Sequence, residues 1–172
     1  MSDRDSFDAL DYLQHRFGDL NDQRATYVLG QLHRVLNGFM TKKINDGELK
    51  VLDFGSGPVV QNSISAAAFA SEIVFSDISS SNREAIQKWL DGDADAFNWS
   101  PHFDYVVQTL EGKGEKEARE REQRMRKLSK VVFCDALSEH PWRKAMRDHT
   151  TLFYSAHVLN VPAAIERVSS VA

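Results

Sequence analysis

Residues 51–58 read VLDFGSGP, an apolar stretch that runs directly into a glycine-rich turn. Glycine accepts the positive φ of a tight turn, which other residues resist. Without side chains at Gly55 and Gly57, a ligand can also come close to the backbone, where N–H groups of a following helix can bind it. The stretch therefore predicts a strand that ends in a turn. It leaves open whether the turn is only mechanical or also binds a ligand.

The surrounding sequence alternates between short apolar stretches and helical patterns. We predict strands at 49–54, 72–76 and 130–134, and helices at 22–40, 58–70, 81–90 and 101–110. Strand and helix alternating over so few residues are typical of a parallel sheet with right-handed crossovers, so the predicted fold class is α/β. Residues 113–130 interleave basic and acidic side chains at helical spacing, which we interpret as a solvated helix face. Residues 150–161 fit either one more strand or an irregular apolar segment.

Length and composition restrict the function classes. The chain has 172 residues, 42% hydrophobic and 27% charged, which fits one globular domain. A net charge of −4 gives no overall attraction to nucleic acid or to anionic membranes, so we expect neither as a partner. The single Cys134 cannot form an internal disulfide, and the acidic N-terminus differs from a signal peptide, so we expect a cytoplasmic protein. The histidines show no metal-binding spacing, and we expect no metal site and an inert thiol at Cys134.

Acidic residues follow the second and third predicted strands. The carboxyl ends of parallel strands meet at one edge of a sheet, so Asp77 and Asp135 should lie near the glycine turn. Asp77 comes 20 residues after Gly57, the spacing at which an acid can accept hydrogen bonds from both hydroxyls of a ribose. Asp135 could bind an adenine amino group while the Ala136 N–H reaches a ring nitrogen, or it could simply cap the next helix.

The turn departs from the pattern that binds a dinucleotide. The position of a third glycine is Val60, and Pro58 stiffens the loop where a pyrophosphate would need backbone N–H groups. A nucleoside without phosphates fits better, and S-adenosylmethionine is such a nucleoside. We therefore favour this cofactor over a nicotinamide dinucleotide.

Four motifs occur together along the chain: LDFGSGP (52–58), EIVFSDIS (72–79) followed by Asn82, AFNWSP (96–101) and VVFCDA (131–136). Together they resemble the nicotinamide, phenylethanolamine and indolethylamine N-methyltransferase family, over about residues 7–142. The motif at 96–101 is far more specific than the glycines. The resemblance implies a Rossmann-like S-adenosylmethionine-dependent methyltransferase fold with an N-terminal helical cap, acting on the nitrogen of a small amine or pyridine. Nothing in the sequence indicates an oligomeric state.

The resemblance also implies which residues bind the cofactor. Tyr12 would close over its methionine end, the turn would touch the methionine moiety, and the strand ends and Asn82 would bind the nucleoside. The implied set is Tyr12, Gly55, Ser56, Gly57, Asp77, Asn82, Asp135 and Ala136. Two tyrosines expected near the methionine end are replaced by Phe17 and Gln61. No catalytic residue is assigned.

Within one domain, 1–172, we expect a helical cap at 1–45, a cofactor-binding core at 46–142 and a divergent tail at 143–172. The tail does not match the family's fourth strand and the strands that follow it, so we expect these C-terminal strands to be missing. Such a sheet would expose an unpaired edge. The alternative to an active enzyme is a truncated, inactive form that binds the cofactor weakly or acts through protein contacts.

Overall fold

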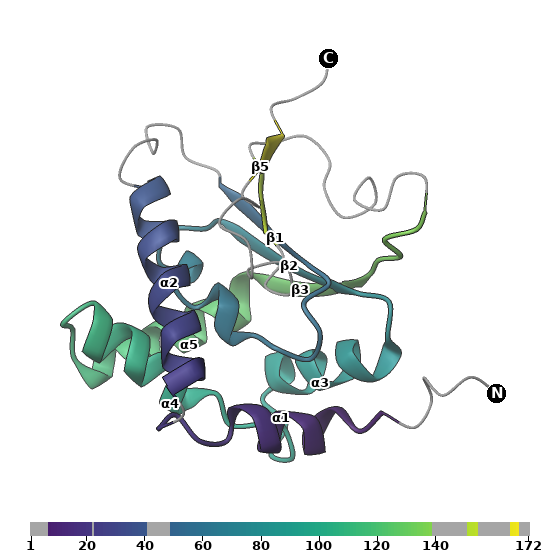
Figure 1. The fold of residues 1–172 in the computed structure, drawn as a ribbon, viewed down its shortest axis with the longest axis horizontal. Coiled ribbons are helices and arrows are strands. Elements are labelled where there is room, and N and C mark those ends of the chain that lie inside the picture. Colours follow the sequence, from purple (N-terminus) through teal and green to yellow (C-terminus); the bar gives the residue numbers. More distant parts are fainter. Residues whose placement is uncertain (1–6, 22, 41–48, 139–150, 155–165, 169–172) are drawn as a thin grey trace.

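The computed structural model of the protein describes residues 7–21, 23–40, 49–138, 151–154 and 166–168. Figure 1 labels the elements. In chain order they are α1 (Ala9–Phe17), α2 (Gln23–Met40), β1 (Lys50–Phe54), the 3₁₀ helices η2 (Gln61–Ser63) and η3 (Ala66–Ala68), β2 (Glu72–Asp77), α3 (Ser80–Asp91), α4 (Ser100–Asp104), the π-helix η4 (Tyr105–Leu110), α5 (Glu115–Leu128), β3 (Ser129–Phe133), β4 (Thr151–Tyr154) and β5 (Glu166–Val168). Within these ranges no helix is both long and apolar enough to cross a membrane.

The strands form a sheet in the order β3-β2-β1-β4-β5. β1, β2, β3 and β4 are parallel to one another, and β5 is antiparallel to β4. Val51 and Leu52 of β1, like Ile73 and Val74 of β2, are fully buried. Continuous apolar strands are expected where a parallel sheet is covered on both faces. The predicted α/β class and the three predicted strands are confirmed.

The tail contributes two strands to this sheet. β4 pairs with β1 along its length, with Val51 opposite Leu152, so the tail continues the sheet beyond β1. Of the segment 150–161, residues 151–154 form a strand, and residues 150 and 155–161 lie outside the described part of the chain. A tail expected to diverge therefore supplies part of the sheet.

β1, β2 and β3 lie side by side at the centre of Figure 1, with the helices on two sides of them. α3 lies below them, and α2, α4 and α5 lie to the left. Trp89, Trp99, Phe75 and Phe103 are the largest fully buried side chains of the core. α3 differs by one residue at each end from the helix predicted at 81–90. The helix ends at Asp91 because Gly92, with a φ of +75°, caps it.

The predicted helix at 58–70 is wrong. The chain there makes two short 3₁₀ turns, η2 and η3, instead of one α-helix. Pro58 has no N–H to donate, and Val59 and Val60 are β-branched, so the local helix preference is weak. Side chains from a distant helix bind the carbonyl groups of this segment, as described below, and so replace helical hydrogen bonds.

The predicted helix at 101–110 is correct only in its first half. It begins as α4 and continues as the π-helix η4 from Tyr105 to Leu110, where Glu111 N donates to Val106 O. Wider turns of this kind are rare and are stabilised by their surroundings. Here η4 packs against α2 and α5.

The charged helix α5 is not solvated all round. Ala118, Arg121, Glu122 and Met125 are buried at spacings of three and four residues. Arginine and glutamate are almost never buried unless they are paired, and both of these are. The predicted solvated face is therefore confirmed only for the outer side of the helix.

Candidate functional site

The glycine turn, residues Gly55–Gly57, follows β1 directly. Gly55 and Gly57 have φ values of +66° and +62°, a conformation in which L-residues are strained. Ser56 N donates to Ser76 O at 2.9 Å, and Ser56 Oγ donates to Gly57 O at 3.2 Å. The first bond holds the turn against the end of β2, and the second lies within the turn.

Asp77 is the last residue of β2 and is 8% exposed. Its Oδ2 accepts a hydrogen bond from Gly57 N at 2.9 Å. Its Oδ1 accepts from Ser79 N at 2.8 Å and from Asn82 Nδ2 at 3.1 Å. The acid and the glycine turn thus lie together, as their spacing of 20 residues predicts.

A cavity of about 360 Å³ opens where β1, β2 and β3 end. We call it the strand-end pocket. It is lined by Phe54, Gly55, Asp77, Ile78, Cys134, Asp135, Ala136 and Leu137. The pocket brings together four of the residues predicted to bind a cofactor, one or two from each strand end.

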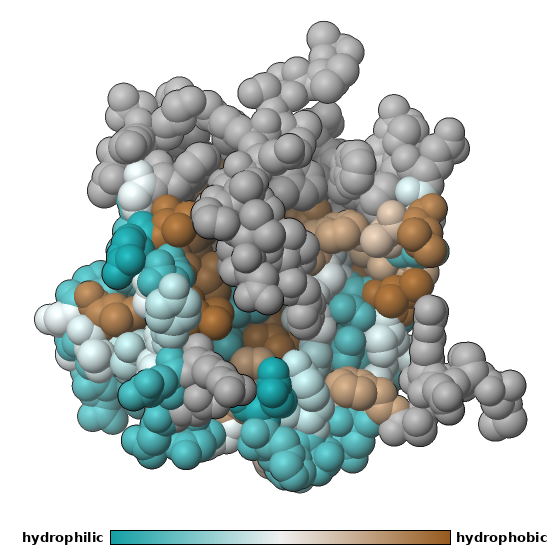
Figure 2. All heavy atoms as spheres, viewed as in Figure 1, coloured by the Kyte–Doolittle hydropathy of each residue, from teal (hydrophilic) through white to brown (hydrophobic). Residues whose placement is uncertain are grey.

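Apolar side chains at the pocket were not predicted. Ile78 is 46% exposed and Leu137 is 94% exposed, which is unusual for such side chains. Figure 2 shows apolar side chains at the right of the view, in the region where the chain leaves β3 in Figure 1. The sequence does hold a signal for these two side chains. Ile78 directly follows Asp77 and Leu137 directly follows Ala136, so both stand next to residues predicted to bind the cofactor.

Asp135 shapes the third strand end. Its Oδ1 accepts a hydrogen bond from Leu137 N at 2.9 Å, and its carbonyl accepts from Ser138 N and Oγ. The carboxylate therefore stabilises a local turn and also lines the pocket. A helix that Asp135 could cap would follow residue 138, outside the described part of the chain.

The remaining predicted residues lie outside the pocket lining. Asn82 contacts Asp77 from α3, and Ser56 and Gly57 lie behind Gly55 in the turn. Tyr12 lies on α1, where its ring packs between Phe7 and Phe17 at centroid distances of 5.4 and 6.0 Å. The structure does not bring Tyr12 into the strand-end pocket.

Two buried oxygen atoms near the turn have no hydrogen-bond partner within the described residues. They are Oδ1 of Asn82 and Oε1 of Gln61, whose residue is 3% exposed. A buried acceptor without a donor is costly, so both atoms could bind a ligand donor.

Cys134 lies between the second and third strand ends and is 6% exposed. Burial raises the pKa of its thiol, and a hydrogen bond with Ser76 acts against that rise. A raised pKa keeps the sulfur protonated and unreactive, in agreement with the predicted inert thiol. Across the described ranges, no three His, Cys, Asp or Glu side chains are grouped as a metal site would need.

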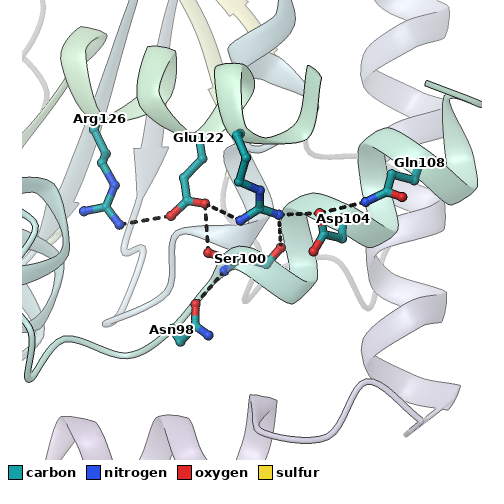
Figure 3. Close-up of polar contacts among 7 residues, drawn as sticks. Asn98, Ser100, Asp104, Gln108, Glu122 and Arg126 are labelled. Carbon is teal, nitrogen blue, oxygen red and sulfur yellow. Dashed lines mark hydrogen bonds and ion pairs between the residues drawn. The ribbon is translucent and has the colours of Figure 1, made fainter. Parts of the chain in front are cut away.

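The motif at 96–101 joins α4 to α5 (Figure 3). Asn98 Oδ1 accepts from Ser100 N at 3.1 Å, and Ser100 Oγ donates to Glu122 Oε2 at 2.9 Å. Trp99 is 1% exposed, and its ring lies 4.6 Å from that of Phe97. The motif thus belongs to the hydrophobic core and does not line the strand-end pocket.

Comparison with known proteins identifies relatives of the chain. The profile of the NNMT/PNMT/TEMT family matches residues 2–169, which extends the resemblance over most of the tail. Nicotinamide N-methyltransferase from Homo sapiens is 31% identical over 137 residues, covering 78% of this chain and 51% of the relative. Phenylethanolamine N-methyltransferase from Homo sapiens is 34% identical over 92 residues, covering 53% of this chain and 32% of the relative. Indolethylamine N-methyltransferase from Mus musculus is 33% identical over 95 residues, covering 53% and 34%.

The chain spans about half the length of the nicotinamide N-methyltransferases that it matches. The family profile nevertheless covers the glycine turn, all three strand ends and the motif at 96–101. The chain therefore belongs to the NNMT/PNMT/TEMT family.

Proposed function

We propose that the protein binds S-adenosylmethionine in the strand-end pocket and transfers its methyl group to a nitrogen of a small amine or pyridine. One observation carries the proposal. The Asp77 carboxylate lies 2.9 Å from Gly57 N, at a pocket that Asp135 and Ala136 also line. The names of the relatives, all N-methyltransferases, support the reaction class.

The acceptors near Asp77 suit the hydroxyls of a ribose. A carboxylate can accept about four hydrogen bonds, and Asp77 accepts three from the described residues. One acceptor position therefore remains on Oδ2. The orphan Oδ1 of Asn82 is a second acceptor, on an amide that donates to the other carboxylate oxygen of Asp77, so the two side chains could receive both ribose hydroxyls.

The pocket walls suit an adenine ring. Ile78 and Leu137 offer apolar surface, and Asp135 and Ala136 offer polar groups from the third strand end. The cavity of about 360 Å³ lies within the range of small-molecule sites. A planar apolar ring with polar edges matches such a lining.

When bound, the cofactor supplies a methyl group on a positively charged sulfur that departs as a neutral thioether. Little acid or base catalysis is needed for that displacement. The contribution of the protein is to bind and orient the nucleoside and to exclude water around it. We assign no catalytic side chain.

Calorimetry with S-adenosylmethionine tests the binding step. We expect the wild-type chain to bind and Asp77→Asn to bind about tenfold more weakly or worse, because a charge-assisted acceptor is lost. The matched control is Asp91→Asn at the exposed end of α3, which should bind like wild type. Absence of binding by the folded wild-type chain would show that the proposal is wrong.

Methyl transfer needs a separate assay. Transfer of a labelled methyl group to nicotinamide, phenylethanolamine or an indolethylamine would support the enzyme. Binding without transfer to any of the three would favour the inactive, cofactor-binding alternative.

A further inference from the structure

The post-turn segment, residues 58–70, connects the glycine turn to β2. It is buried over most of its length, with Val60, Ile64, Ala66, Ala67 and Ala70 fully buried. Its 3₁₀ turns leave carbonyl groups that no α-helical N–H satisfies. Buried carbonyls need donors, so the conformation of this segment depends on groups from elsewhere in the chain.

Two arginines of α5 supply those donors. Arg124 donates from Nε to Ala67 O at 2.9 Å and from Nη2 to Ala70 O at 2.8 Å. Arg121 donates from Nη1 to Ile64 O at 3.2 Å. The planar guanidinium of Arg124 bridges two carbonyls, which a lysine ammonium cannot do in the same geometry.

Arg121 is itself held in place. Its Nη1 and Nη2 donate to the two carboxylate oxygens of Glu111 at 2.9 and 2.8 Å. Both side chains are nearly buried, with 8% and 9% exposed. A bidentate pair of this kind fixes the orientation of the guanidinium that reaches Ile64.

α2 also contacts the segment. His33 Nδ1 lies 3.1 Å from Ser65 Oγ, and Asn37 Nδ2 lies 2.8 Å from His33 Nε2. The amide of Asn37 is a donor, so His33 Nε2 accepts and Nδ1 carries the proton that Ser65 receives. Side chains of both α2 and α5 therefore bind the same segment.

We propose that Arg124, together with Arg121, is a positioning residue for the glycine turn and hence for the strand-end pocket. Only residues 58–60 lie between the turn and η2, and Pro58 restricts their backbone. A shift of the segment must therefore move Gly57, whose N–H binds Asp77, and Gly55, which lines the pocket. The effect on cofactor affinity rests on the proposed function, whereas the effect on the turn does not.

Amide hydrogen exchange of Gly57 tests the positioning role directly. We expect Arg124→Met to raise its exchange rate about tenfold, because the segment loses two charge-assisted hydrogen bonds. Arg124 is exposed, so its replacement opens no cavity. Arg124→Lys should give an intermediate rate. Amides of β1 such as Leu52 should exchange as in the wild type.

The matched control is Arg119→Met on the same helix. Arg119 binds Ser100 O, Glu122 and Asp104, and none of these belongs to the post-turn segment. The control should leave Gly57 exchange unchanged after correction for global stability, measured by urea unfolding of each variant. Unchanged Gly57 exchange in Arg124→Met, or an equal rise in Arg119→Met, would overturn the inference. If Arg124→Met does not fold, Arg124→Lys decides the comparison.

Calorimetry with S-adenosylmethionine separates this inference from the proposed function. We expect Arg124→Met to bind about fivefold more weakly than wild type and Arg119→Met to bind normally. Equal affinity of Arg124→Met and wild type would overturn the role at the pocket. If wild type does not bind, the proposed function fails, and Gly57 exchange still decides whether Arg124 positions the turn.

Discussion

His102 is a histidine without a polar partner in the core. It is 1% exposed, and neither ring nitrogen has a hydrogen-bond partner within the described part of the chain. Its ring lies 4.8 Å from that of Trp99 and 6.2 Å from that of Phe97. Burial among aromatic rings disfavours the charged imidazolium and lowers the pKa of His102 to about 4.

This lowered pKa predicts a loss of stability in acid. The unfolded chain takes up a proton at His102 below about pH 6.5, whereas the folded chain stays neutral down to about pH 4. The free energy of unfolding should therefore fall between these pH values, by up to about 3 kcal/mol. Urea unfolding at a series of pH values measures the fall.

His102→Leu should remove most of this pH dependence and change stability at neutral pH by about 1 kcal/mol, since two orphan nitrogens disappear. The exposed His15 gives the control, because His15→Gln should leave the acid loss in place. An unaltered pH profile in His102→Leu would contradict the assignment.

The amino ends of β1, β2 and β3, which are neighbours in the sheet, share one ionic contact. Glu72 of β2 lies between Lys50 of β1, at 3.0 Å, and Lys130 of β3. Lys50 and Glu72 are directly opposite in the strand register. Burial raises the pKa of Glu72, but hydrogen bonds from the two lysines outweigh it, so that the pKa is lowered overall.

Glu72→Gln should reduce stability by about 0.5–1 kcal/mol, because the contact is partly exposed. The loss should shrink at high salt, where exposed charges are screened. A carboxyl with a lowered pKa stabilises the fold above its unfolded value of 4.5, so the wild-type advantage should disappear as pH falls below that value. Thermal unfolding of the variant and of Glu84→Gln, an exposed acid on α3, at low and high salt measures the difference. Equal losses of stability in Glu72→Gln and Glu84→Gln would show that the ionic contact of Glu72 with Lys50 and Lys130 contributes nothing.

Glu122 connects elements that are distant in sequence (Figure 3). It accepts hydrogen bonds from Ser100 at 2.9 Å, from Arg119 at 3.1 Å and from Arg126 at 3.0 Å. The guanidinium of Arg126 also donates to Trp89 O and lies 4.3 Å from the centroid of the Trp89 ring. α3, α4 and α5 are thus joined through one carboxylate.

Glu122→Gln should lower the free energy of unfolding by about 2 kcal/mol, because two guanidinium groups lose a largely buried partner. Glu120→Gln is the matched control, since Glu120 is 61% exposed and lies two residues earlier on the same helix. Urea unfolding of both variants measures the difference. A loss in Glu122→Gln no larger than in the control would contradict the role of the network in joining the helices.

The strands and the meeting of Gly57 with Asp77 could be predicted because they depend on short-range properties of the chain. Continuous apolar stretches become buried parallel strands, and the carboxyl ends of such strands must meet at one edge. The positions predicted from residues 49–54 and 72–76 therefore differ from β1 and β2 by one residue at most. The family was also identified from the sequence, through the resemblance of four motifs to those of a known family, and the family profile over residues 2–169 confirms it.

Other features required the folded chain. The 3₁₀ turns at 61–68 form where Arg121 and Arg124, more than fifty residues later, reach the carbonyls of Ile64, Ala67 and Ala70. The π-helix, the buried face of α5 and the orphan nitrogens of His102 likewise depend on which distant side chains pack beside them. Local helix or strand preference and hydrophobic periodicity do not predict such contacts. The sequence alone thus predicts the strands and turn that form the backbone of the site. The hydrogen bonds that stabilise this backbone come from distant residues, which only the folded chain brings together.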